Sequence, residues 1–143
     1  MARFSRVIRS TLSPAQAFAY MADFTNVPEW DHTASDASRL DDGPIGLGSE
    51  FRLTARFAGR SVPLTYRISE FDDGRRFVIE ARRPSAISRD TVTVTPREDG
   101  SDVAYDAVLE MTGWMRLAAP VVSLLFARLG ASAVKGLERV LQP

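Results

Sequence analysis

Few side chains in this sequence could carry out acid–base chemistry. His32 is the only histidine, and it follows Asp31 just after Trp30. An imidazole is the commonest general base near neutral pH. The sequence pairs it with no nucleophile, so a solvated loop histidine is the preferred interpretation of His32 and a catalytic base the alternative.

Asp90 is the more informative carboxylate. In the alternating segment that begins there, it shares a face with Val92 and Val94. A carboxylate on an apolar face needs a partner, or its pKa rises. Asp90 could orient a ligand or act as acid or base. The preferred interpretation is plainer, a strand-end carboxylate near solvent or an ion-pair partner of Arg83 or Arg89.

Two phenols, Tyr66 and Tyr105, fall on the apolar faces of other alternating segments. Each could hydrogen-bond to a ligand carbonyl, or only to a buried backbone group. We expect no metal, because one histidine, no cysteine and no clustered carboxylate motif offer too few ligands. We also expect no cofactor, because the glycines at 43, 46 and 48 precede no helix and form no phosphate-binding loop.

Composition narrows the class of protein. The 143 residues are 45% hydrophobic and 25% charged, which is typical of one globular domain. Eighteen basic residues balance 18 acidic residues, so we expect no nucleic-acid partner. The absence of cysteine excludes disulfides and thiolate chemistry. The first residues contain no continuous apolar segment of the secretory type, so a cytoplasmic location is the default expectation.

The first elements that must position these groups are a strand and two helices. Residues 4–10 read as a strand. Ser13 is a good N-cap and Pro14 suits the first helical position, which predicts a helix over 13–21. A second short helix is expected over 26–30, and Trp30 is interpreted as the packing anchor of this helix pair.

Alternating segments joined by turn signals follow, which predicts an antiparallel meander. Asp72-Asp73-Gly74 is a turn of the Asp-Gly type, and a tight connection is expected at Ala58-Gly59-Arg60. The expected strands cover residues 34–40, 50–57, 62–71, 76–82, 90–95 and 103–111.

One long apolar helix is expected from Trp114 to the C-terminus. Pro120 should kink this helix or mark a fresh start, because proline lacks a backbone donor. The apolar run 117–127 lies between Arg116 and Arg128 and is far shorter than the ~20 residues that span a membrane. We therefore expect no transmembrane segment, and we expect this run to be buried against the concave face of the sheet.

Residues spread over nearly the whole chain carry a family resemblance: Ser13-Pro14-Ala15, Phe18, Met21-Ala22-Asp23, Asn26, Pro28-Glu29-Trp30, Gly46-Leu47-Gly48, Phe51, Tyr66-Arg67-Ile68-Ser69-Glu70-Phe71-Asp72, Gly113, Leu117 and Pro120. In these residues the chain resembles the START-like superfamily (SRPBCC), also called the helix-grip or Bet v 1-like fold, and within it the polyketide cyclase/dehydrase and lipid-transport group. The resemblance implies an α+β domain over residues 1–143. A curved antiparallel sheet of about seven strands, with two short helices after the first strand, would wrap around the C-terminal helix and enclose a deep, mostly apolar cavity.

Small inward residues support the cavity. Ala55, Ala81 and Ala107 leave room that larger side chains would fill, which is the preferred interpretation; the alternative is that they let the helix approach the sheet closely. The predicted ligand-binding residues are Phe51, Leu53, Tyr66, Ile68, Phe77, Ile79, Asp90, Tyr105, Ala107, Leu109, Val121 and Leu125.

Three functional hypotheses follow from the resemblance and the pattern. The first is sequestration or transport of a hydrophobic small molecule such as a lipid or polyketide. The second is a polyketide cyclase or dehydratase in which Tyr66, Asp90 or His32 moves protons. The third is a protein-interaction module, which an exposed apolar patch on the C-terminal helix would favour. The oligomeric state, monomer or homodimer, stays open.

Overall fold

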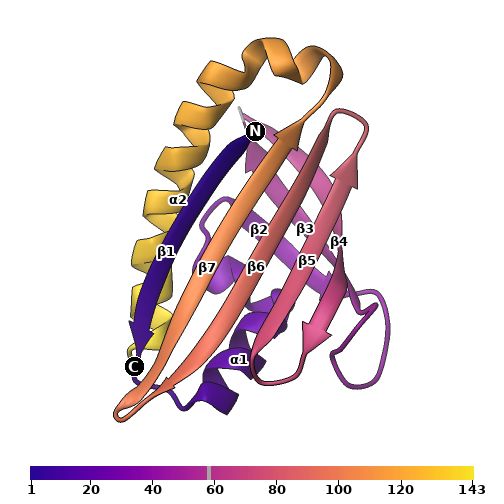
Figure 1. Ribbon diagram of the computed structural model, residues 1–143. Coiled ribbons are helices and arrows are strands. Elements are labelled where there is room, and N and C mark those ends of the chain that lie inside the picture. Colours follow the sequence, from indigo (N-terminus) through magenta and orange to yellow (C-terminus); the bar gives the residue numbers. More distant parts are fainter. Residues whose placement is uncertain (58) are drawn as a thin grey trace.

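A single antiparallel sheet forms most of the molecule (Figure 1). The computed structural model describes residues 1–57 and 59–143. A strand and two short helices come first, then six strands and the C-terminal helices. The elements are β1 Ala2–Ser10, α1 Pro14–Ala22, η1 Phe24–Glu29, β2 Ala34–Arg39, β3 Glu50–Phe57, β4 Arg60–Asp72, β5 Arg76–Arg83, β6 Ala86–Arg97, β7 Gly100–Met111, η2 Gly113–Ala118 and α2 Ala119–Leu141.

The sheet has the order β1-β7-β6-β5-β4-β3-β2, with every neighbouring pair antiparallel. It curves so that α1, η1 and α2 lie on its concave side (Figure 1). This is the helix-grip architecture, and the prediction of a curved meander is confirmed. The predicted connection at Ala58-Gly59-Arg60 includes residue 58, which lies outside the described residues.

Helix α1 begins as its sequence predicts. The Ser13 hydroxyl accepts from the Gln16 backbone N–H at 3.2 Å, and the Gln16 side chain accepts from the Ser13 N–H at 3.1 Å. This reciprocal pair satisfies two donors at the helix start. One face of α1 then buries Phe18 and Met21 against the sheet, where the Phe18 ring meets Phe77 edge-on at 5.7 Å.

Strand β6 is longer than predicted, and this changes the position of Asp90. The predicted strand starts at residue 90, but β6 begins at Ala86, directly after the Pro84–Ser85 turn. Pairing with both β5 and β7 holds this first part in the sheet, although its own residues alternate weakly. Asp90 therefore lies inside a central strand, and its interpretation as a strand-end carboxylate is wrong.

The C-terminal helix makes a fresh start at Pro120. Residues Gly113–Ala118 form the 3₁₀ helix η2, and Pro120 then occupies the first turn of α2, where it removes no needed donor. The second half of α2 packs closely on the fold at two glycines. A Cβ on Gly130 would lie 2.5 Å from the Phe4 ring, and one on Gly136 would lie 2.1 Å from the Trp30 carbonyl oxygen.

The first half of the C-terminal helix is mostly exposed, which contradicts the predicted burial of 117–127. Leu117 is 89% exposed and Val121 63%, whereas Val122 is buried in a small cluster with Ala2 and Met111. The helix runs along the β1 edge of the sheet (Figure 1). In its first half, therefore, only one narrow face of the helix packs against the strands. The segment Gly113–Leu141 is long and apolar enough to cross a membrane by length and composition alone, with 11% of its most apolar window buried.

Candidate functional site

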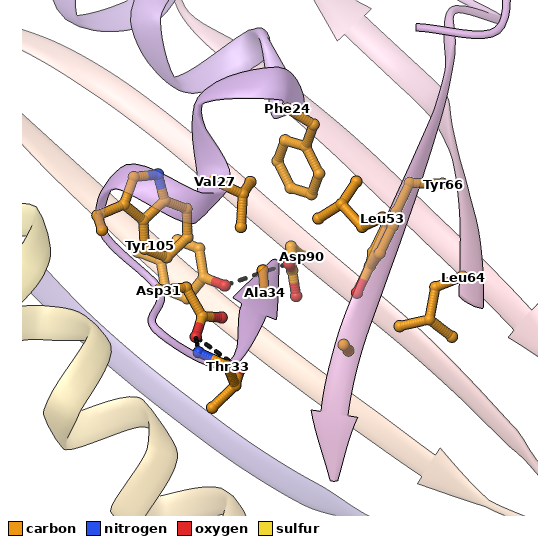
Figure 2. A pocket seen from close by; sticks show the side chains of 12 residues that line it. Phe24, Val27, Asp31, Thr33, Ala34, Leu53, Leu64, Tyr66, Asp90 and Tyr105 are labelled. Carbon is orange, nitrogen blue, oxygen red and sulfur yellow. Dashed lines mark hydrogen bonds between the residues drawn. The ribbon is translucent and has the colours of Figure 1, made fainter. Parts of the chain in front are cut away.

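A small cavity lies between η1, the segment after it and the inner faces of the sheet (Figure 2). Its volume is about 50 Å³. Most of its wall is aliphatic or aromatic, and the polar exceptions are two phenols, two carboxyls and one hydroxyl. The lining residues are Phe24, Val27, Trp30, Asp31, Thr33, Ala34, Leu53, Ala55, Leu64, Tyr66, Asp90 and Tyr105.

A carboxyl–phenol pair forms the polar part of this cavity. Asp90 is 7% exposed, and its Oδ2 accepts a hydrogen bond from the Tyr105 hydroxyl at 3.2 Å. These residues stand on the adjacent strands β6 and β7, where Asp90 is in register with Ala107. The small Ala107 side chain leaves room beside the carboxyl. Tyr66 on β4 faces the same cavity (Figure 2).

Burial changes the acid–base behaviour of this pair. Removal from water raises the pKa of Asp90 to about 7, and the nearby charges of Asp31 and Asp106 act in the same direction. The Tyr105 hydrogen bond opposes the rise, because it stabilises the carboxylate. Burial and the neighbouring Asp90 also raise the pKa of Tyr66 and of Tyr105. At neutral pH Asp90 can therefore both donate and accept a proton, while both phenols stay protonated.

The segment after η1 closes one side of the cavity. Asp31 Oδ1 accepts from the Thr33 backbone N–H at 2.9 Å and from the Thr33 hydroxyl at 2.6 Å, which fixes a tight turn. Trp30 is buried, and its ring meets Tyr105 edge-on at 5.7 Å. Trp30 is thus both a cavity wall and the surface on which Gly136 of α2 packs.

The twelve predicted ligand-binding residues fall into three groups. Leu53, Tyr66, Asp90 and Tyr105 line the cavity. A second group is buried in the core beneath it: Phe51, Ile68, Phe77, Ile79 and Ala107. The remaining three lie on β7 and α2: Leu109, Val121 and Leu125. Leu109 packs in the small cluster around Val122.

Val121 and Leu125 are exposed on α2, at 63% and 37%. Their predicted place in the cavity wall is wrong, because α2 lies along the edge of the sheet and turns only its narrow packed face inward.

His32 is exposed and does not line the cavity. Its Nδ1 lies 3.1 Å from the Ser132 hydroxyl of α2. This contact ties α2 to the turn at the edge of the cavity. The two arginines expected as ion-pair partners of Asp90 bind other groups. Arg83 donates to the Pro63 carbonyl at 3.1 Å, and Arg89 binds Glu80 and Glu110 on the other face of the sheet.

Sequence reasoning missed the walls supplied by η1 and the turn after it, namely Phe24, Val27, Asp31, Thr33 and Ala34. Their apolar or turn character is visible in the sequence, but nothing local shows that this segment folds over β3 and β4. Leu64 also lines the cavity, on the same face of β4 as Tyr66.

The cavity is far smaller than the deep pocket that the resemblance implies. Sites for drug-sized ligands have volumes of roughly 300–1,000 Å³. Here the large buried side chains of Phe24, Phe51 and Phe77 pack against one another across the concave face. In this conformation the cavity therefore accepts only one end of such a ligand.

A larger and more open groove of about 510 Å³, which we call the outer groove, lies between α1, the β2–β3 connection and the β4–β5 turn. Ala15, Ala19 and Phe71 contribute to its wall. Its arginine, Arg39, is already bonded to Asp41 and to the Gly43 carbonyl. The outer groove is therefore large enough for a ligand, but its arginine is not available to bind the polar end of one. Among the described residues, no group of three or more potential metal-ligating side chains comes together.

Comparison with solved structures shows the same fold at low identity. The START superfamily protein from Mycobacterium smegmatis superposes with a TM-score of 0.75 at 15% identity, covering 99% of this chain and 97% of that one. TTHA0849 from Thermus thermophilus gives 0.74 at 20% identity, covering 96% and 94%. The di-domain ARO/CYC BexL from the BE-7585A biosynthetic pathway gives 0.67 at 17% identity, covering 100% of this chain and 48% of BexL.

At these identities the structures establish the fold alone. No functionally curated protein matches the chain in sequence. The family model described as polyketide cyclase/dehydrase and lipid transport matches residues 1–142. This match covers η1 and all the strands that line the cavity. The chain therefore belongs to the polyketide cyclase/dehydrase and lipid transport family.

Proposed function

We propose that the protein sequesters or transports a hydrophobic small molecule, such as a lipid or polyketide, whose oxygen-bearing end enters the cavity. The observation that carries this proposal is a buried carboxyl–phenol pair, Asp90 and Tyr105, in the wall of a cavity whose lining is mostly aliphatic or aromatic. A protonated Asp90 donates to a ligand carbonyl, and an ionised one accepts from a hydroxyl. Apolar contact with Leu53 and Phe24 supplies most of the affinity.

The apolar remainder of the ligand needs more room than the cavity has. Segments with few buried contacts open at low cost. The first half of α2 and the preceding η2 are such a segment, because η2 contains no buried residue and α2 buries only Val122 before Ala133. Displacement of this segment from the sheet would uncover Leu109 and Met111, which lie on the same face of β7 as the cavity-lining Tyr105.

The fluorescent probe N-phenyl-1-naphthylamine tests this proposal, because its emission rises on transfer into an apolar site. We expect saturable binding by the wild type and displacement by long-chain carbonyl compounds. Ala55→Leu fills the cavity, since Ala55 lines it and is only half-buried. Ala55→Leu should therefore weaken binding about tenfold or more, by the size of the added apolar group.

Ala19→Leu is the matched control, because it adds the same atoms to the outer groove instead. Unchanged binding by Ala19→Leu supports the cavity. Loss of binding in Ala19→Leu with full binding by Ala55→Leu would move the site to the groove. Absence of saturable binding in the wild type would contradict the proposal.

A second candidate is a cyclase or dehydratase acting on a poly-β-ketone chain. The observation that favours it is the Asp90 pKa of about 7 inside a cavity, which suits both removal and return of a proton. The Asp90 carboxylate would take a proton from a carbon between two ketones. The electron pair left on that carbon would form a bond to another ketone carbon of the chain. The new alkoxide would then take the proton from Asp90.

Loss of water would follow when Asp90 removes a second proton from the same carbon and the hydroxyl leaves with a proton from Tyr66 or from solvent. Asp90→Asn tests this candidate, because it keeps the shape of the side chain and removes its basicity. We expect turnover of a poly-β-ketone to be abolished while probe binding persists. His32→Ala, at an exposed residue that does not line the cavity, is the comparison and should keep turnover. Unchanged turnover in Asp90→Asn would remove the assignment of Asp90.

A further inference from the structure

Five exposed apolar side chains follow one another along η2 and the first half of α2. Within α2, Val121, Leu124 and Leu125 share one face, because they are spaced by three and four residues. In η2, Trp114 and Leu117 are spaced by three residues and lie one above the other. Trp114 is 68% exposed and Leu117 89%. We call this set the apolar stripe: Trp114, Leu117, Val121, Leu124 and Leu125.

Within the segment that carries the apolar stripe, the charged residues all have one sign. Arg116 and Arg128 are exposed at its two ends, and Lys135 follows further along α2. Between Glu110 and Glu138 the sequence contains no acidic residue. The end of β5 adds the exposed Arg82 and Arg83, of which Arg82 lies 3.8 Å from Glu80. This end of β5 lies beside η2, since the Thr112 N–H donates to the carbonyl of Ser85 in the following turn at 2.9 Å.

We infer that the apolar stripe is a docking surface for an anionic lipid bilayer. An apolar helix face flanked by cations, with an exposed tryptophan at one end, lies in the plane of a membrane interface. The flanking cations are attracted to anionic headgroups. The helix does not cross the bilayer, because its second half is held to the fold by Ala133, Gly136 and Leu137.

A second copy of the chain fits this surface less well. Most soluble homodimers are twofold symmetric, so the same patch meets itself. Arg116 and Arg128 of one copy would then face the cations of the other, with no acidic residue in the segment to balance them. A bilayer that contains anionic lipid supplies the opposite charge and also covers the apolar side chains.

The apolar stripe lies on the segment whose opening is part of the proposed function, because both comprise η2 and the first half of α2. The proposed opening of η2 and α2 would therefore occur at the membrane surface. Docking itself needs no ligand and can be measured separately.

Vesicle binding by the full chain tests the inference. Vesicles of phosphatidylcholine mixed with phosphatidylglycerol are compared with vesicles of phosphatidylcholine alone, by co-sedimentation and by tryptophan emission. We expect binding to the anionic vesicles only, with a blue shift that added salt reverses. The shift reports Trp114, because Trp30 is only 5% exposed and already buried. Trp114→Phe should abolish it.

Two matched variants isolate the apolar stripe. Leu117→Glu should weaken vesicle binding about tenfold or more, because it removes a large apolar contact. Leu47→Glu makes the same change at a leucine that is 72% exposed in the β2–β3 connection, and should bind as the wild type does. Arg116→Gln and Arg128→Gln should each weaken binding about fivefold.

Three results would overturn the inference: no binding to anionic vesicles, equal binding by Leu117→Glu and Leu47→Glu, or a concentration-dependent dimer that Leu117→Glu abolishes without vesicle binding in the wild type. The last result would assign the surface to a second copy. Probe binding without vesicles should be the same in Leu117→Glu and the wild type, so failure of docking and failure of ligand binding are separate outcomes.

Discussion

At the scale of single residues, Asp90 connects the sequence pattern to the site. The alternation of β6 predicts its inward face, beside Val92 and Val94, and all three are buried. Its hydrogen bond to Tyr105 could not be predicted, because it depends on the register of β6 against β7 across a distance of 15 residues in sequence. The sequence thus indicates that this carboxyl needs a hydrogen-bonding partner, and the pairing of β6 with β7 places the Tyr105 hydroxyl beside it.

Asp90 makes the protein less stable as the pH rises. Folding raises its pKa from an ordinary 3.8 to about 7, so the folded state binds a proton more tightly than the unfolded chain does. The unfolding free energy should therefore fall between pH 4 and pH 7, by up to about 1.4 kcal/mol per pH unit. The charges of Asp31 and Asp106 add to this trend, and the phenols of Tyr66 and Tyr105 do not titrate in this range.

Asp90→Asn should flatten this part of the profile and be more stable than the wild type at pH 8. Denaturant unfolding of both proteins from pH 4 to pH 8 measures the difference, and contributions of other groups cancel in it. Parallel profiles for the two proteins would show that Asp90 is ionised at an ordinary pKa.

Loss of the Tyr105 hydroxyl should raise the pKa of Asp90 further, whereas Asp90→Asn removes the titrating group. Tyr105→Phe removes the hydrogen bond that stabilises the Asp90 carboxylate, so the pKa of Asp90 should rise further. The midpoint of the stability profile should move to higher pH, with a cost of about 1 kcal/mol at neutral pH.

Tyr20→Phe is the matched control for Tyr105→Phe, because the Tyr20 hydroxyl bonds to the exposed Glu29 at 2.6 Å, away from the cavity. An unchanged midpoint in Tyr105→Phe would mean that the phenol does not set the pKa of Asp90.

At the scale of elements, the sequence predicts the boundary of a helix or strand when interactions between near neighbours in the sequence determine it. The cap at Ser13 predicts the start of α1, because the interactions involved span three residues. The start of β6 was missed, because residues 86–89 alternate weakly and are held by pairing on both sides. The exposure of Leu117 and Val121 was missed too, since an apolar pattern does not show which faces find a partner.

The contact between α2 and Trp30 gives a test at this scale. Gly136→Ala would place a methyl group 2.1 Å from the Trp30 carbonyl oxygen, so the helix must shift. We expect a loss of about 1–3 kcal/mol in unfolding free energy, although alanine favours a helix by about 1 kcal/mol over glycine. Thermal or denaturant unfolding measures it.

Ala127→Gly, at an exposed position of the same helix, measures the propensity contribution alone. If Gly136→Ala stabilised the protein by the amount that Ala127→Gly destabilises it, the close approach of α2 to Trp30 would be refuted.

At the scale of the whole molecule, the order of elements was enough to predict the fold. Strand, two short helices, six strands and a long helix form a helix-grip domain, as the structure shows. The size of the cavity was not predictable in the same way. It depends on how Phe24, Phe51 and Phe77 pack across the concave face, and these side chains come from three distant segments.

The account rests on a ligand that enters this cavity, and native mass spectrometry tests that most directly. Wild type, Ala55→Leu and Ala19→Leu would be incubated with a cell extract from the source organism and transferred intact into the gas phase. We expect the wild type and Ala19→Leu to retain one discrete, oxygen-containing apolar molecule, and Ala55→Leu to retain none. No retained molecule on the wild type, or the same molecule on Ala55→Leu, would contradict the account.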